Sequence, residues 1–182
     1  MSIITDWISG KIPTSKEEED QILLRGSEEY KINCTKNPGG LCEKEVTKVF
    51  LKYGYKKVAT TLKCDWMGPK KRLQPDLVTD KYVVEVKGMR YYNSQGKRGN
   101  QGTAPEKIDS VYRKYSNITD KTVLVVLCAD MQTNPDAAMF LDAYTHGYHK
   151  NEVVNCLYKT FGKRIIFLRF RDLDDFLKKQ SE

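Results

Sequence analysis

The sequence predicts an α/β domain in which a central mixed sheet is flanked by helices. The run Thr122–Ala129 (TVLVVLCA) is continuously apolar, as expected for a central strand buried on both faces. The run Tyr82–Gly88 is rich in β-branched residues and ends at a glycine, which is typical of a strand. Apolar residues recur at helical spacing before, between and after these runs, so helices are expected to cover the sheet.

The chain is long enough for one domain with a hydrophobic core, at 182 residues. We expect a single domain over residues 1–182, with its core fold at about residues 41–170. Residues 1–33 are expected to form an N-terminal helical extension, because Thr14 and Ser15 before a run of acidic residues predict a helix start. This helix either packs on the core or contacts DNA or a second subunit.

The composition is that of a soluble globular protein, with 40% apolar and 30% charged residues. No apolar run approaches the roughly 20 residues that a membrane-spanning helix needs, and the N-terminal residues lack the pattern of a signal peptide. The five cysteines include no C-x-x-C pair, which favours reduced thiols over a zinc site or disulfides. We therefore expect an intracellular, cytoplasmic protein without a membrane partner.

The chain has an excess of positive charge, with a formal net charge of +7 and a pI of about 9. An excess of this sign favours a polyanionic partner such as a nucleic acid. It disfavours a purely structural α/β domain that binds no nucleic acid.

A loop, a helix and an edge strand are expected ahead of the strand at residue 82. Asn37–Gly40, with one proline and two glycines, is expected to be a loop. Leu41–Lys52 has the apolar spacing of a helix. Glu43 lies at the edge of its apolar side, whereas Glu45 points further round the helix. An edge strand is expected within Tyr55–Lys63.

A two-residue turn before Tyr82 predicts a β-hairpin that brings two carboxylates together. In its register Thr79 pairs with Tyr82, and Asp76 lies opposite Glu85. Lys87 shares a face with Glu85, because side chains alternate along a strand. Directly opposed residues have Cβ atoms about 5 Å apart, and like charges there are destabilising. The two carboxylates therefore need a proton or a cation between them.

Two polar segments flank the hairpin and are expected to contact a substrate. A basic turn, Gly68–Arg72, precedes it. Arg90–Gly102 follows it and is rich in Arg, Asn, Gln and aromatic residues, which bond base edges and stack on bases.

Helices and strands are expected to alternate in the second half of the chain. Thr103 and Glu106 form the pattern of a capping box, which gives Glu106 a structural role. The expected elements are a helix from Thr103 to about Ser116, a strand over Thr122–Ala129, a helix from Asn134, a second helix over Asn151–Phe161 after a break at Gly147, a strand over Arg164–Phe170 and a helix over Asp172–Lys179.

The hairpin carries the residue types of a magnesium site with an adjacent ammonium group. Mg²⁺ prefers oxygen ligands about 2.1 Å away and keeps several waters, so Asp76, Glu85 and the carbonyl of Val86 are predicted ligands. Lys87 is predicted to act on the attacking water and to stabilise developing charge. Glu43 is predicted to complete the site or to recruit a second metal.

The motif resembles that of a known nuclease superfamily. Pro75-Asp76, followed nine positions later by Glu85-Val86-Lys87, resembles the PD-(D/E)xK motif of many restriction endonucleases and Holliday-junction resolvases. The element order over 41–170, roughly two thirds of the chain, resembles the α-β-β-β-α-β restriction-endonuclease-like core of that superfamily. The segment Gln101–Lys107 is similar to one seen in some small restriction-type endonucleases. In resolvase-like members a glutamate precedes a helix-ending glycine by about three turns, and Glu43 matches that place relative to Gly54.

The resemblance implies a metal-dependent endodeoxyribonuclease that hydrolyses phosphodiester bonds in double-stranded DNA, most simply a sequence-specific type II restriction endonuclease. It implies Mg²⁺ as cofactor, with Mn²⁺ able to substitute, and a homodimer, because cutting both strands of a palindrome calls for two active sites. The alternatives are a structure-specific nuclease such as a Holliday-junction resolvase and a non-catalytic DNA-binding module on the same fold. The predicted DNA contacts are Lys70, Lys71, Arg72, Arg90, Lys97, Arg98, Asn100 and Gln101.

Overall fold

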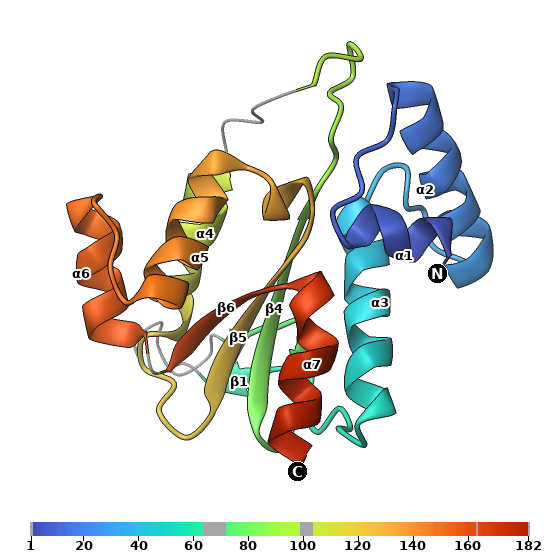
Figure 1. Cartoon of the computed structure of the whole chain (residues 1–182). Coiled ribbons are helices and arrows are strands. Elements are labelled where there is room, and N and C mark those ends of the chain that lie inside the picture. Colours follow the sequence, from blue (N-terminus) through green and yellow to red (C-terminus); the bar gives the residue numbers. More distant parts are fainter. Residues whose placement is uncertain (1, 64–71, 99–103, 163, 182) are drawn as a thin grey trace.

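A mixed four-stranded sheet lies at the centre of the fold and has helices on both faces (Figure 1). The structure is a computed structural model that describes residues 2–63, 72–98, 104–162 and 164–181. The strands, in spatial order, are β3 Leu77–Val78, β4 Tyr82–Met89, β5 Thr122–Ala129 and β6 Ile165–Arg169. β3 is antiparallel to β4, and β4, β5 and β6 are parallel. The expected α/β class with a mixed sheet is confirmed.

The helices form two layers, one on each face of the sheet (Figure 1). One core contains side chains from α1 Ile3–Ile8, α2 Lys16–Tyr30, α3 Pro38–Lys52 and α7 Phe170–Ser181. The other contains side chains from α4 Ala104–Tyr115, α5 Pro135–His146 and α6 Glu152–Phe161. Among the described residues, no helix combines the length and apolar character needed to cross a bilayer.

The alternation of side chains along β4 decides which face carries the predicted site. Tyr82, Val84 and Val86 belong to the core beneath α3 and α7, whereas Val83 belongs to the core beneath α4 and α5. Glu85 and Lys87 follow Val83 at period two, so they point to the α4 side of the sheet. Their common face is confirmed by an ion pair between Glu85 and Lys87.

Two helix starts show how side-chain caps set the boundaries. Ser15 caps α2 by accepting a hydrogen bond from the Glu18 amide, as predicted. The prediction that Asn37–Gly40 is a loop is wrong, because Asn37 caps α3 and Pro38 occupies its first turn. Proline is favoured at this position, where its missing N–H would have no helical partner.

Other boundaries differ from the prediction by a few residues. Of the strand expected within Tyr55–Lys63, the structure has β1, Leu62–Lys63, which pairs with β2, Arg72–Leu73, and an isolated bridge between Ala59 and Val78 of β3. Strand β6 ends at Arg169 and the chain enters α7 directly at Phe170, without the expected connection. The predicted cap Thr103 lies outside the described residues.

Candidate active site

The hairpin register brings Asp76 to the strand that carries Glu85. Leu77 pairs with Val84 and Val78 pairs with Val83, which confirms the predicted register. One further step along the same register places Asp76 opposite Glu85. The Asp76 Oδ2 atom accepts a hydrogen bond of 2.6 Å from the Val86 amide, so this carboxylate is anchored to the backbone of β4.

The same register leaves the Val86 carbonyl facing a proline. The Thr79 amide donates to the Tyr82 carbonyl at 2.8 Å, which marks residues 82, 84 and 86 as the hydrogen-bonded positions of β4. Val86 is therefore opposite Pro75, and a proline has no N–H to donate. The register therefore offers the Val86 carbonyl no backbone donor from residue 75, which is compatible with the predicted ligand role.

The predicted site acids Asp76, Glu85 and Glu43 are here called the carboxylate cluster. Glu85 is the most buried of them, with 3% of its side chain exposed. Its Oε1 atom accepts from Lys87 Nζ at 2.6 Å and from Lys114 Nζ at 2.8 Å. Its Oε2 atom accepts from the Tyr115 hydroxyl. Helix α4 thus supplies two site residues that sequence reasoning did not assign to the site. The helical spacing over Thr103–Ser116 predicts that Tyr115 faces inward and that Lys114 is available to solvent or phosphate, and neither prediction points to Glu85.

The pKa of Glu85 is shifted in the opposite direction from the pKa values of Asp76 and Glu43. Burial acts to raise the pKa of Glu85, but the charge of Lys87 and the hydrogen bonds from Lys114, Lys87 and Tyr115 outweigh it and lower the pKa. Burial raises the pKa of Asp76 to about 6, with further increases from the Glu85 and Glu43 charges. Burial and the Glu85 charge likewise raise the pKa of Glu43. Asp76 and Glu43 are therefore the acids that resist ionisation.

Glu43, rather than Glu45, is the glutamate of α3 whose charge interacts with Glu85 and Lys87. Glu43 is half-buried, and its pKa responds to Glu85 and Lys87. Glu45 points instead toward α2, where it accepts from the Tyr30 hydroxyl and from Lys48 Nζ at 2.9 Å.

Gly88 allows α3 to approach β4 closely enough for this arrangement. A Cβ atom on Gly88 would stand 2.5 Å from the Cys42 Sγ atom and 3.3 Å from the Cys42 Cβ atom. Cys42 is fully buried and immediately precedes Glu43. The missing side chain at Gly88 therefore sets the depth at which Glu43 is held.

The donor set fits a hard divalent cation. In the described part of the chain, neither Asp76 nor Glu43 has a lysine or arginine within ion-pair distance, whereas Glu85 has two lysines. Also among described residues, no three Asp, Glu, His or Cys side chains form a metal cage by themselves. Asp76, Glu85 and the Val86 carbonyl would provide two side-chain ligands and one backbone ligand, which suits Mg²⁺ because that ion retains several waters.

The predicted DNA contacts fall into three groups. Arg72, Lys97 and Arg98 are exposed. Arg90 is instead held by two acids of α2, with its Nε atom 3.0 Å from Glu19 Oε2 and a second ion pair to Asp20. This intramolecular pairing removes Arg90 from the DNA contacts that we propose. The other four predicted contacts lie outside the described residues: Lys70, Lys71, Asn100 and Gln101.

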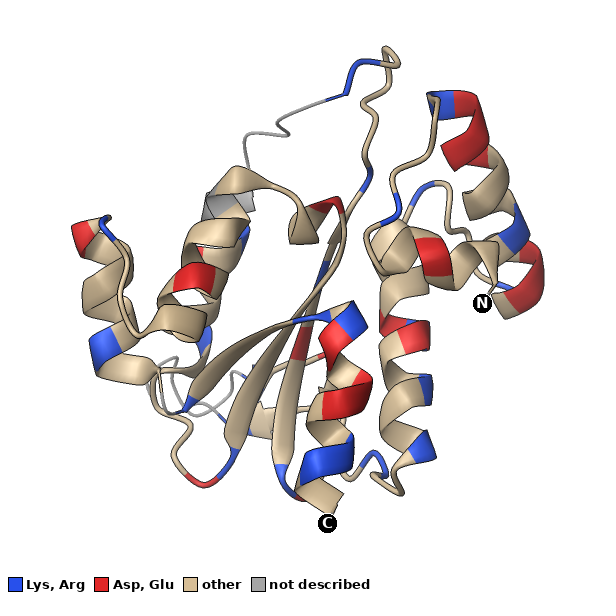
Figure 2. Cartoon of the chain, in the orientation of Figure 1, with Lys and Arg blue, Asp and Glu red and all other residues tan. Residues whose placement is uncertain are grey.

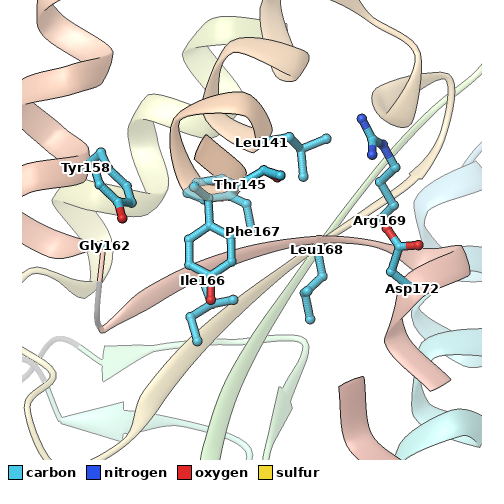
Figure 3. Close-up of a pocket in the computed structure, with 10 residues that line it drawn as sticks. Leu141, Thr145, Tyr158, Gly162, Ile166, Phe167, Leu168, Arg169 and Asp172 are labelled. Atoms are coloured by element: carbon cyan, nitrogen blue, oxygen red, sulfur yellow. The ribbon is translucent and has the colours of Figure 1, made fainter. Parts of the chain in front are cut away.

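A separate cavity of about 550 Å³ lies beside the edge strand β6 (Figure 3). Leu141 and Phe167 line it with apolar surface, and Arg169 and Asp172 lie near one another at one side. Among the described residues that line this cavity, none belongs to the predicted catalytic set. The cavity and the carboxylate cluster are therefore distinct features.

Comparisons of this chain with protein-family models, with curated proteins and with solved structures find no match.

Proposed function

We propose that this chain is a divalent-metal-dependent endonuclease that hydrolyses phosphodiester bonds in double-stranded DNA. The observation that carries the proposal is the Glu85–Lys87 ion pair beside Asp76, which is anchored on the Val86 amide and whose pKa burial and the charges of Glu85 and Glu43 raise to about 6. A strongly perturbed carboxyl group in a cluster of charged side chains is a feature of many catalytic sites. The mixed sheet and the element order are compatible with the restriction-endonuclease-like fold that the motif implies.

Each residue of the cluster has a distinct proposed role. A bound Mg²⁺ or Mn²⁺ ion would lower the pKa of a water ligand and stabilise charge on the scissile phosphate. Asp76, Glu85 and the Val86 carbonyl would hold that ion, and Glu43 would be the accessory carboxylate. Lys87 would orient the attacking water and stabilise the developing charge, because its ammonium group is fixed 2.6 Å from Glu85. Lys114 would contribute a second positive charge from α4.

Duplex DNA is the proposed substrate because of where the charge lies. Helix α2 has six acidic and two basic residues in a chain with a net charge of +7, so the positive excess lies outside α2. Figure 2 shows blue Lys and Arg positions on the ribbon that follows β4 and red Asp and Glu positions on α2. The exposed Lys97 and Arg98 are close in sequence to Lys87 and are the proposed DNA contacts of this segment. We further propose a cytoplasmic homodimer, since cutting both strands calls for two sites.

The proposal is tested by incubating purified protein with plasmid and linear duplex DNA. We expect cleavage with Mg²⁺ or Mn²⁺ and none with EDTA. Asp76→Ala and Lys87→Ala should each abolish cleavage while the circular dichroism spectrum stays unchanged. Unimpaired cleavage by both variants would contradict the site assignment.

The pattern of products separates the two kinds of nuclease. Discrete fragments from a long duplex indicate a sequence-specific restriction enzyme, which the exposed basic segment after β4 favours. Cleavage confined to four-way junctions would indicate a resolvase instead.

A further inference from the structure

The segment Tyr92–Arg98, here called the arm, is an ordered turn rather than an irregular loop. Tyr92 and Arg98 form a β-bridge at its base. The Asn93 side chain accepts from the Gln95 amide at 2.9 Å and from the Lys97 amide at 3.0 Å. Figure 1 shows the arm rising from the end of β4 beside the start of α2. The arm therefore presents the exposed side chains of Lys97 and Arg98 in a defined turn.

The base of the arm is fixed by a single buried carboxylate from α2. Glu19 is fully buried. Its Oε1 atom accepts from the Trp7 indole at 3.0 Å and from the Tyr91 amide at 2.8 Å. Its Oε2 atom accepts from Arg90 Nε at 3.0 Å and from the Tyr92 amide at 3.3 Å. Four donors, one from α1 and three from residues 90–92 where the arm begins, thus converge on one side chain.

Further contacts join the arm to the N-terminal segment. The Tyr92 hydroxyl donates to the Pro13 carbonyl at 2.8 Å. Gly96, at the turn of the arm with φ +73°, lies close to α2, since a Cβ atom there would stand 3.9 Å from the Lys16 Cδ atom. Both the base and the turn of the arm therefore rest on residues 13–19.

We propose that residues 3–30 serve as a mount for the arm, with Glu19 as the positioning residue that aims Lys97 and Arg98 at duplex DNA beside the catalytic strand. The inference rests on the proposed function and assigns a role to the N-terminal segment. A buried carboxylate with four donors holds its partners in one geometry, because each displaced donor would lose a charge-assisted hydrogen bond. DNA contacts made by Lys97 and Arg98 would then depend on a residue that touches no DNA.

The first test compares Glu19→Gln with the double variant Lys97→Ala/Arg98→Ala. Glu28→Gln is the matched control, since Glu28 is an exposed acid on the same helix. In plasmid cleavage, Glu19→Gln should raise KM about tenfold and change kcat less than about twofold, which is the pattern of lost substrate binding. The double variant should also lower the slope of log affinity against log salt by about 1.8, the value for two phosphate contacts. This slope is measured with a labelled short duplex in EDTA.

The second test is limited digestion with trypsin. It does not depend on catalysis, so its result can be interpreted even if the protein does not cleave DNA. Trypsin cuts after Lys97 and Arg98, so the rate of cutting there reports how firmly the arm is held. Glu19→Gln and Tyr92→Phe should each speed this cleavage several-fold relative to wild type and to Glu28→Gln. Tyr92→Phe removes only the bond to Pro13 and serves if Glu19→Gln fails to fold.

Three outcomes would overturn the inference. One is a wild-type trypsin pattern in the folded mount variants. Another is a loss in kcat with KM unchanged in Glu19→Gln. The third is an unchanged salt slope in the double variant. Absence of cleavage by the wild type would instead count against the proposed function alone, provided that DNA binding and trypsin cutting still respond to the variants.

Discussion

Two carboxylates lie against the same stretch of chain, Asp76 at Val86 and Glu19 at Tyr91 and Tyr92, and their surroundings differ. Glu19 is fully buried and accepts from four donors, one of them the Arg90 guanidinium. Asp76 accepts from the Val86 amide and is faced by the charges of Glu85 and Glu43. Burial alone therefore does not identify a functional acid. The difference indicates that Glu19 stabilises the fold, and it is compatible with our proposal that Asp76 binds a cation.

The largest effect on stability is expected from removing Glu19, the carboxylate that accepts four hydrogen bonds. Glu19→Ala leaves Trp7, Arg90 and two backbone amides without their acceptor, and breaking a buried charge pair of this kind costs about 3–5 kcal/mol. Urea denaturation should show a matching loss in the free energy of unfolding. Glu28→Ala, on the exposed part of the same helix, should change it by less than about 0.5 kcal/mol. Equal effects of the two variants on the free energy of unfolding would contradict the structural role assigned to Glu19.

Removing the Asp76 carboxylate should have the opposite effect and raise the free energy of unfolding. Because the Asp76 pKa is raised from 3.8 to about 6, its ionisation at pH 7 opposes folding, and Asp76→Asn should stabilise the metal-free protein by about 3 kcal/mol. Between pH 4 and pH 6 the native state binds more protons at this site than the unfolded chain does. The Asp76 contribution to stability is therefore present at low pH and lost as the pH rises through about 6.

The measurement is the unfolding midpoint in EDTA across this pH range. The difference between Asp76→Asn and wild type should grow from pH 4 to pH 7. A constant difference, or a destabilised variant at pH 7, would contradict the role assigned to Asp76.

Gly88→Ala should disturb the site by pushing α3 away from β4. Overpacking of this kind costs about 1–3 kcal/mol, and DNA cleavage should fall because Glu43 moves with Cys42. Adding Cys42→Ala removes the Sγ atom that lies 2.5 Å from the new Cβ, so the double variant should recover both stability and cleavage. Gly39→Ala is the control, since its Cβ would meet only the Asn37 Oδ1 atom at 3.4 Å. Failure of Cys42→Ala to rescue would refute the steric explanation.

The smallest effect is expected at the lysine from α4. Lys114→Ala removes one of the two ammonium groups on Glu85 Oε1 and leaves the other in place. Cleavage should fall about tenfold, equivalent to about 1.4 kcal/mol, rather than disappear as expected for Lys87→Ala. A DNA cleavage rate equal to that of wild type would show that Lys114 does not contribute to cleavage.

The sequence allowed the hairpin to be predicted but not the helices that complete the site. The two-residue turn before Tyr82 fixed the register, so the pairing that aligns Asp76 with Glu85 could be worked out from residue order alone. Lys114 and Tyr115 reach Glu85 from α4, across a separation in sequence that no local pattern encodes. The amphipathic spacing of α4 did place Tyr115 inward, and that was the available signal.

Arg90 is the reverse case, a residue that the sequence predicts as a DNA contact but that the structure pairs with acids of its own chain. A basic residue directly after the strand that carries Glu85 and Lys87 fits a DNA contact, but its actual partners, Glu19 and Asp20, lie about seventy residues away in sequence. The misassigned loop at Asn37–Gly40 has a local cause, since an Asn-Pro pair is common both in turns and at helix starts. Long-range ion pairs, rather than propensities, account for the larger error.

The most direct test of the central claim is calorimetric titration of Mn²⁺ into the metal-free protein at pH 7, for wild type and Asp76→Asn. A cluster held for a cation predicts saturable binding by the wild type, and binding by Asp76→Asn that is weakened at least about tenfold, or about 1.4 kcal/mol. Glu28→Gln should bind Mn²⁺ as the wild type does. Equal binding by wild type and Asp76→Asn, or no binding by the wild type, would contradict the account.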